Sequence, residues 1–535
     1  MSFRLNPAGE QQLSLFDSYM NLTDREKRFL NKSWAKYFAD NIFPRIDEKP
    51  YAVLYSDKDS RPGTPVNIIL SALIIKEYLG FSDDDILTSL MFDIRLQVAM
   101  HTTSFMEQPL SDRTLGRFRQ RCAVYLEETG IDLIKNTVES ISGEMAEMMK
   151  LDQSLRRMDS LMVESNIKKM TRLELLYTCV SNLAKELTND KITLPEELLH
   201  YTKENDRNLV VYHNKSEETS SKIETILKDA CTLKSLCGSS YDDSSNYQLL
   251  LRVLKEQAVE QEDGNYRLRK KEDGGMNSEI LQNPSDPDAT FRDKAGKQHR
   301  GYVANVTECC GENGSLVTNY QYEQNNHSDS EFLEDAINEM GPQEETVTIA
   351  TDGAYSSEKN EELAAQNNIK LVATNLTGRK ADDIAADFEF NEEGTKVMKC
   401  PAGHAPKSCS YNKKNGQCTV SFYREHCENC PHRKECHVHE HKRVFRRTIS
   451  LKSKHRAHQQ RYRSSEEFSK YSRFRNGVET IPSILRRKYG IDHMPVRGLN
   501  RTKQLFGIKI AALNIAKFCK FMQERDKCAL LPVNA

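Results

Sequence analysis

Apolar residues recur at helical spacing through the first 150 residues. One stripe consists of Leu70, Leu73 and Ile74, and a second of Ile86, Leu87 and Leu90. Ser82 precedes three aspartates, a pattern that caps a helix start because the hydroxyl and early carboxylates satisfy its free N–H groups and dipole. The pattern predicts an all-helical N-terminal domain over residues 1–150.

A second helical pattern covers residues 170–279, where two further apolar stripes are followed by a polar, acidic stretch. The stripes are Leu173, Leu176, Tyr177, Val180, Leu183 and Leu187, then Ile223, Ile226, Leu227, Leu233 and Leu236. This pattern separates β-prone segments at residues 151–169 and 280–399. We therefore interpret it as a helical insertion that packs or dimerises.

The β-prone pattern resumes in two runs, residues 301–308 and 315–322, joined by a Gly-Glu-Asn-Gly turn typical of a hairpin. A helix is expected near residues 330–339, a strand at 346–352, a helix near 357–366 and a strand at 370–374. This order predicts an α/β core.

Length and composition limit the class of protein. A chain of 535 residues with 38% hydrophobic and 29% charged residues predicts two to four packed domains. The longest apolar run, residues 66–75, is shorter than the roughly 18 residues of a membrane span, and the N-terminus lacks an apolar signal region. Fourteen cysteines without such a signal favour reduced thiols or metal ligands. We expect a soluble, cytoplasmic protein with no membrane partner.

Charge is distributed unevenly along the chain. Residues 441–510 contain 19 lysines and arginines against four acids, a formal charge of +15, whereas the remainder carries −17. Such a block can neutralise phosphates, although most charge runs are solvated helix faces. The aromatic residues Tyr462, Phe468, Tyr471 and Phe474 among the cations favour nucleic-acid binding.

A second group of cations lies near the expected start of a helix at residues 110–119. Arg113 and Arg117, with Arg119 and Arg121, give this helix a basic face. The face is compatible with helix-turn-helix contacts to duplex DNA and equally with a plain helical bundle.

Three carboxylates lie within distinctive sequence motifs. Asp159 lies in Met-Asp-Ser-Leu-Met-Val-Glu-Ser-Asn, Asp352 in Thr-Ile-Ala-Thr-Asp-Gly-Ala-Tyr, and Glu479 ends the basic segment that begins at Tyr471. Carboxylates gathered from distant parts of a chain suit two-metal phosphoryl chemistry, since hard divalent cations prefer oxygen ligands.

These phrases resemble the DDE transposases of bacterial insertion sequences, in the branch with a tyrosine-arginine-glutamate-lysine signature. The resemblance runs from about residue 61 to 522 and implies an RNase H-like catalytic core in which Asp159, Asp352 and Glu479 bind two Mg²⁺ or Mn²⁺ ions. It further implies cleavage of DNA strands at terminal inverted repeats, followed by transesterification into a target. The expected partner is double-stranded DNA, bound by a homodimer, so that the protein is nucleoid-associated when on DNA. No phosphate-binding loop motif is present, which predicts no use of ATP.

The third acid departs from the family pattern. Ser472 occupies the position of the signature tyrosine, with Tyr471 one residue early, and Arg486 replaces the lysine. Pro482 fits only the first turn of a helix, which predicts that Glu479 lies near a helix start. Glu466 and Glu467 remain alternatives. Arg475 and Arg486 are candidates to bind the phosphates of the scissile strand, and Arg473 is a further candidate to bind DNA.

A cysteine-rich segment, residues 400–440, interrupts the core before its last part at residues 441–525. Cys400, Cys427, Cys430 and Cys436 have the spacing of a structural Zn²⁺ site, with His404 and His432 as substitutes. The alternative is that some of these thiols are simply buried, and Cys409 and Cys418 dilute the pattern.

Two other functions remain compatible with the sequence. One is a catalytically inactive protein, derived from a transposase, with a DNA-binding or regulatory role. The other is an RNase H-like nuclease that cuts without joining. Only the enzymes require all three acids, and since all three are present the sequence favours an active transposase.

Overall fold

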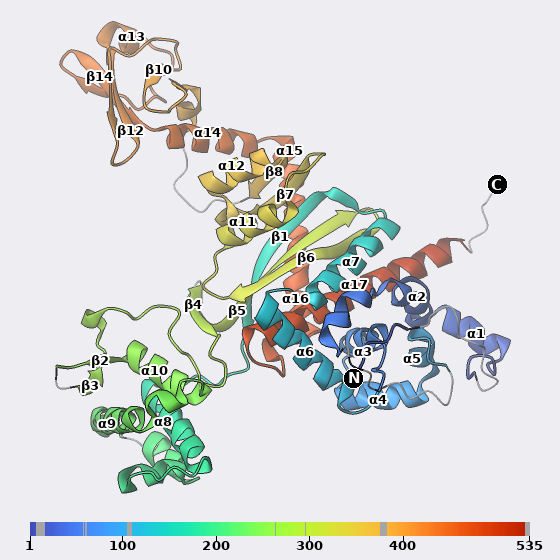
Figure 1. Ribbon diagram of the computed structural model, residues 1–535. Coiled ribbons are helices and arrows are strands. Elements are labelled where there is room, and N and C mark those ends of the chain that lie inside the picture. The colour runs from blue at the N-terminus through green and yellow to red at the C-terminus, as the bar shows by residue number, and fades with distance from the viewer. Residues whose placement is uncertain are drawn as a thin grey trace. The chain divides into compact units, whose positions relative to one another are not determined.

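The computed structural model describes residues 1–6, 17–56, 58, 61–103, 110–213, 215–262, 264–294, 296–374 and 382–529 (Figure 1). The chain forms two compact units. Unit 1 comprises residues 1–341 and 478–535, and unit 2 comprises residues 342–477.

Unit 1 begins with helices, as the apolar spacing predicts. These are α1 (Asp24–Asn31), α2 (Trp34–Asn41), η1 (Phe43–Arg45), η2 (Lys49–Leu54), α3 (Val66–Leu79), α4 (Asp83–Phe92), α5 (Ile94–Ala99), α6 (Thr114–Thr129) and α7 (Leu133–Met148). Helix α3 is buried over most of its length because it is apolar on every side. Ser82 forms the expected capping box with Asp85 at the start of α4. The helical N-terminal region is therefore confirmed.

An antiparallel sheet lies at the centre of unit 1. Its strands are β1 (Asp152–Glu164), β4 (Thr290–Lys294), β5 (Lys297–Gly311) and β6 (Gly314–Gln324). Strand β5 pairs with β1, β4 and β6, and the β5–β6 hairpin turns at the predicted glycines. Asp159 is opposite Val306 in this sheet. The first candidate acid therefore stands on a strand held by a long partner.

Helices α7 and α17 (Leu499–Ala529) pack against β6, as Figure 1 shows. Gly507 permits the close approach of α17, since a Cβ there would collide with the hydroxyl of Tyr320 on β6. Helices α11 (Asp329–Met340) and α16 (Thr480–Arg487), with the turn η11 (Ile491–His493), complete this part. One continuous hydrophobic core joins the N-terminal helices, β1, β5, β6, α16 and α17.

The helical insertion has a hydrophobic core of its own. Its main helices are α8 (Arg172–Asn189), α9 (Thr219–Cys237) and α10 (Ser245–Gln257). A small hairpin is formed by β2 (Ala258–Glu260) and β3 (Tyr266–Leu268). The short helical turns are η3 (Glu196–Thr202), η4 (Asn208–Tyr212), η5 (Ser216–Glu218), η6 (Gly238–Tyr241) and η7 (Lys271–Asp273). The two predicted apolar stripes meet in this core, where Leu176 and Leu227 are fully buried; Leu236, predicted as part of the second stripe, is instead exposed. A separate core explains how the insertion can interrupt the β segments without disturbing them.

Unit 2 begins with two parallel strands, β7 (Val347–Asp352) and β8 (Ile369–Thr374), connected through η8 (Gly353–Tyr355) and α12 (Glu358–Gln366). Two basic helices, α14 (Leu451–Arg463) and α15 (Glu466–Asn476), follow later in the chain, and α15 packs on β7 and β8. The predicted strand–helix–strand order is present here.

The cysteine-rich segment of unit 2 forms a small antiparallel sheet in the order β11-β12-β14-β13. The strands are β11 (Ser408–Asn412), β12 (Gln417–Tyr423), β13 (His439–His441) and β14 (Val444–Ile449), with the pair β9 (Glu389–Phe390) and β10 (Val397–Lys399), the turn η9 (Asp383–Asp387) and the short helix α13 (Arg424–Glu428). The molecule is thus a mixed α/β protein with a helical N-terminal region. None of the helices in the described ranges has both the length and the apolar character that crossing a membrane requires.

Candidate active site

Asp159 lies in the interior of β1, between the buried side chains of Met158 and Leu161. Its carboxylate is half-buried and accepts a hydrogen bond from the main-chain N–H of Ser160 at 3.1 Å. The β-prone run around it explains the strand, since Leu161, Met162 and Val163 all pack into the core. Asp159 is therefore a carboxylate fixed on a rigid element.

Asp352 is the last residue of β7, and the chain turns into η8 directly after it. Its carboxylate is half-buried and accepts a hydrogen bond from the N–H of Gly353, which begins the turn. The carboxyl ends of parallel strands are where open α/β sheets bind ligands. The second acid occupies such an end of the β7–β8 pair.

Glu479 is exposed and stands at the junction of η10 (Gly477–Glu479) and α16, where it is the N-cap residue. Pro482 falls in the first turn of α16, where its missing N–H costs nothing. The prediction that Glu479 lies near a helix start is confirmed. The basic helix α15 ends at Asn476, so Arg475, Glu479 and Arg486 do not share one continuous helix.

Arg486 ties α16 to the strand that carries Asp159. Its guanidinium donates to the main-chain carbonyl of Met162 at 2.8 Å and to the carboxylate of Asp492 at 3.1 Å. Asp492 also accepts from the N–H of Glu164, at the end of β1, at 3.4 Å. Within unit 1, the helix that follows Glu479 is therefore anchored to β1. Sequence reasoning missed Asp492, since an acid six residues after an arginine has no distinctive pattern.

The other arginines predicted to bind DNA differ in exposure. Arg113 and Arg117, at the start of α6, are exposed, and so is Arg473 on α15. Arg475 is only 7% exposed. Solvent access therefore leaves Arg113, Arg117 and Arg473 open to a phosphate, whereas Arg475 is packed inside unit 2.

The segment from Asn283 to Arg292 positions the start of α17. Asp286 is fully buried and accepts hydrogen bonds from the Tyr302 hydroxyl at 2.6 Å, from the Ser165 hydroxyl and from the N–H of Gly498 at 3.1 Å. Burial and the adjacent Asp286 carboxylate raise the pKa of Tyr302 well above its usual range. Asp286 therefore joins the end of β1 to α17.

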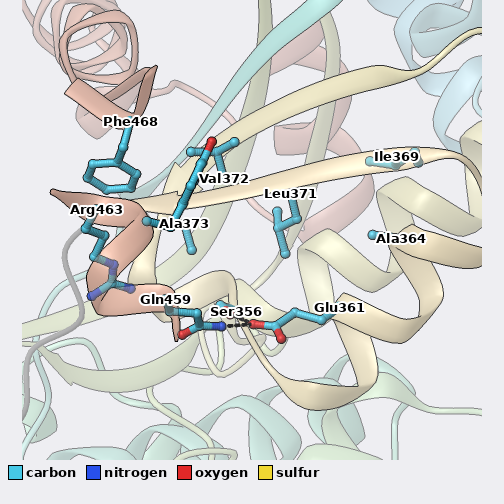
Figure 2. Close-up of a pocket in the computed structure, with 11 residues that line it drawn as sticks. Ser356, Glu361, Ala364, Ile369, Leu371, Val372, Ala373, Gln459, Arg463 and Phe468 are labelled. Carbon is cyan, nitrogen blue, oxygen red and sulfur yellow. Dashed lines mark hydrogen bonds between the residues drawn. The ribbon is translucent and has the colours of Figure 1, made fainter. Parts of the chain in front are cut away.

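A cavity of about 250 Å³ opens in unit 2 beside the turn that follows Asp352 (Figure 2). Glu361 accepts hydrogen bonds from the Ser356 hydroxyl and from the Gln459 amide, both at 2.7 Å, and so fixes one wall. Arg463 and Phe468, from the basic helices, form part of the opposite wall. Burial lowers the pKa of Arg463 from its ordinary value. The cavity therefore has a partly desolvated cation in its wall.

The four predicted zinc ligands, Cys400, Cys427, Cys430 and Cys436, line one narrow cavity in unit 2. Burial and the three neighbouring thiols raise the pKa of Cys427 to about 11, and Arg447 donates to the carbonyl and sulfur of Cys436. Among the residues that the structure describes, no group of three or more His, Cys, Asp or Glu side chains is arranged to hold a metal ion. The zinc prediction is therefore not confirmed.

Two parts of the chain match known protein families. Residues 399–519 match the family described as "Transposase DDE domain", and residues 27–121 match "Transposase domain (DUF772)". No curated protein and no solved structure matches the chain.

The first match contains Glu479 and both basic helices, and the second contains most of the N-terminal helices. Together they support a DDE-type transposase. This class of enzyme acts on DNA and uses divalent metal ions, typically Mg²⁺.

Proposed function

We propose that this protein is a DDE transposase that cleaves DNA strands at the terminal inverted repeats of an insertion sequence and transfers them to a target. We assign it to the branch with the tyrosine-arginine-glutamate-lysine signature. In this chain Arg486 replaces the lysine of that signature. The observation that carries the proposal is the pair of transposase-family matches, to residues 27–121 and 399–519, the second of which contains Glu479.

The proposed catalytic residues are Asp159, Asp352 and Glu479. Their chemistry fits hard divalent cations, because each offers carboxylate oxygens and is half-buried or exposed. Bound Mg²⁺ would supply Lewis acidity at the scissile phosphodiester. The chain's own part is to hold the carboxylates still: Asp159 by the β1–β5 pairing, and Glu479 through the anchored helix α16.

An RNase H-like core is the fold we propose for these three acids. The antiparallel β1, β5 and β6, followed by α11, β7, α12 and β8, have the strand and helix order expected of that fold. We retain the domain division with helical DNA-binding residues 1–150, core residues 151–169, 280–399 and 441–525, insertion 170–279 and cysteine-rich residues 400–440.

Double-stranded DNA is the proposed partner, bound by a homodimer without ATP. Arg113 and Arg117 on α6 and Arg473 on α15 are exposed and suit phosphate contacts. On the surface of unit 2, the ammonium of Lys370 lies 5.3 Å from the ring centre of Tyr471 and is paired with Glu467. Affinity for DNA should therefore fall steeply with added salt.

We further propose that the cysteine-rich segment binds one structural Zn²⁺ ion. The support is that Cys400, Cys427, Cys430 and Cys436 line the same cavity. Binding would require the thiols to lose their protons and close around the ion.

Strand cleavage of a duplex carrying the element's own terminal repeat tests the proposed enzyme. We expect Mg²⁺-dependent nicking and joining by the wild type, and a loss of at least about 100-fold in Asp159→Asn, Asp352→Asn and Glu479→Gln. Each variant should keep its affinity for the repeat, since an amide replaces the carboxylate at nearly constant shape.

Glu466→Gln and Glu467→Gln are the matched controls and should cleave normally. Glu467 is paired with Lys370 at 2.5 Å, so its removal also shows what a broken surface ion pair costs. Loss of activity in a control, with Glu479→Gln still active, would move the third acid to that position. A wild type that binds the repeat but never cuts it would leave a DNA-binding protein without catalysis, and cutting without joining would leave a nuclease.

A further inference from the structure

A cavity of about 730 Å³ lies within unit 1, and none of the three acids lines it. Its walls come from α3, α4 and α6 on one side and from residues 488–496 and α17 on the other. A volume of this size is typical of sites for small molecules and cofactors. Nothing in the proposed chemistry uses it.

The acids in the cavity wall are already neutralised. Asp83 accepts hydrogen bonds from Lys76 at 2.7 Å and from Arg119, and Glu77 accepts one from Lys509 at 2.5 Å. Burial alone would raise the pKa of Asp83, but the hydrogen bonds from Arg119 and Lys76 lower it to about 2. These two carboxylates therefore leave no negative charge available to a ligand.

Two further cations give the cavity a positive surplus. Arg501 donates to the neutral amide of Gln120 at 2.7 Å, and the Lys488 ammonium lies 5.3 Å from the ring centre of Tyr489. Within the described part of the chain, neither Arg501 nor Lys488 has a carboxylate within ion-pair distance. The surplus favours an anionic ligand.

Two deeply buried polar groups in the wall have unmet hydrogen-bonding capacity. The amide nitrogen of Gln504, 4% exposed, and the hydroxyl of Tyr489, 3% exposed, have no hydrogen-bond partner in the described part of the chain. Leaving such a group unpaired costs about 1–3 kcal/mol, so it is usually paired or awaits a ligand. Phe81 and Leu505 supply an apolar surface in the same cavity.

We propose that this cavity binds a nucleotide. Its phosphate would be held by the surplus charge of Lys488 and Arg501, and its base would lie on the apolar wall, where Gln504 can donate to a base edge. The inference goes beyond the proposed transposase activity. A free nucleotide and an unpaired nucleotide of a DNA strand share this chemistry.

Titration of the full-length protein with AMP, without metal, tests the shared chemistry by calorimetry. We expect saturable binding that weakens at least tenfold in both Gln504→Leu and Arg501→Ala. Lys520→Ala, which removes an exposed cation from the same helix outside the cavity, should bind AMP as the wild type does. Arg501 is exposed, so Arg501→Ala should fold even if Gln504→Leu does not.

A competition arm distinguishes the two sources. If the nucleotide comes from DNA, a short single-stranded oligo-dA should displace AMP from the wild type; if the ligand is a free nucleotide, it should not. Absence of AMP and oligo-dA binding, or binding unchanged in Arg501→Ala, would overturn the inference. Because this assay needs neither metal nor Asp159, its failure is distinct from a failure of strand cleavage.

Discussion

The guanidinium of Arg486 donates to the main-chain carbonyl of Met162, a residue 324 positions earlier in the chain, at 2.8 Å. Met162 lies three residues after Asp159 on β1, and Arg486 lies seven residues after Glu479. This one contact links the strand of the first acid to the helix that follows the third. The arginine that sequence reasoning assigned to DNA phosphates thus has an internal partner.

Replacement of Arg486 by alanine should lower strand cleavage at least tenfold while leaving affinity for DNA nearly unchanged. The expected cause is loss of the anchor between α16 and β1, which lets Glu479 depart from its working position. Cleavage rate and DNA affinity, measured on the same preparation, separate the two effects. Arg486→Lys, which keeps one donor, should recover part of the rate.

Arg487→Ala is the matched control, since Arg487 is exposed on the same helix turn. It should leave the cleavage rate close to that of the wild type. If Arg486→Ala instead weakened DNA binding and reduced its salt dependence by about one phosphate contact, Arg486 would be a DNA ligand.

Replacement of Asn514 by leucine should destabilise unit 1 by roughly 2–4 kcal/mol. Asn514 is fully buried on α17; its amide donates to the carbonyl of Val317 at 2.6 Å and to Ser142 at 2.9 Å, and accepts from the N–H of Val317 at 3.0 Å. It therefore pairs with β6 as another strand would, and leucine leaves both main-chain groups of Val317 unpaired. Urea unfolding measures the change. Gln523→Leu, nearer the end of α17, should shift the midpoint little, and equal midpoints for both variants would contradict the strand-like role.

Local patterns made much of the fold predictable. The capping box at Ser82, the β5–β6 hairpin and the start of α16 near Pro482 each depend on residues close in sequence. Asp159 and Asp352 could be found because each ends or occupies an apolar run within a distinctive phrase. The order of strands and helices followed from the same periodicities.

Contacts between distant segments were not predictable. The acceptor of Arg486 is a backbone carbonyl, which leaves no trace in residue identity. Asp286 has the sequence surroundings of an ordinary loop acid, yet it is buried and joins Ser165, Tyr302 and Gly498. The charge surplus of the large cavity depends on which cations find acids, and only the fold decides that.

Metal analysis of the full-length protein, purified without chelator, should find about one zinc per chain. Cys427→Ser and Cys430→Ser should each lower the zinc content strongly, because both thiols line the shared cavity. Cys409→Ser provides the control, since Cys409 lies in the same cysteine-rich segment, on β11, but outside that cavity. Wild-type protein without zinc would leave the four cysteines as free thiols, of which Cys436 is buried and the other three are half-buried.

Glu139 on α7 should make the stability of unit 1 fall as pH rises from about 4.5 to 7. Burial raises the pKa of Glu139 to about 7, and the neighbouring Glu339 adds to the effect although Lys135 opposes it. The folded state then holds a proton that the unfolded chain has already released, so folding is penalised progressively across this interval.

Glu139→Gln removes the titration but keeps an oxygen to accept from the Asn319 amide, which lies 2.8 Å from Glu139. Thermal unfolding at pH 5 and pH 8 should show the variant gaining about 2–3 kcal/mol on the wild type at the higher pH. Glu147→Gln, an exposed position on the same helix, should follow the wild type at both values; a parallel pH dependence of Glu139→Gln and wild type would show that Glu139 ionises normally in the folded protein.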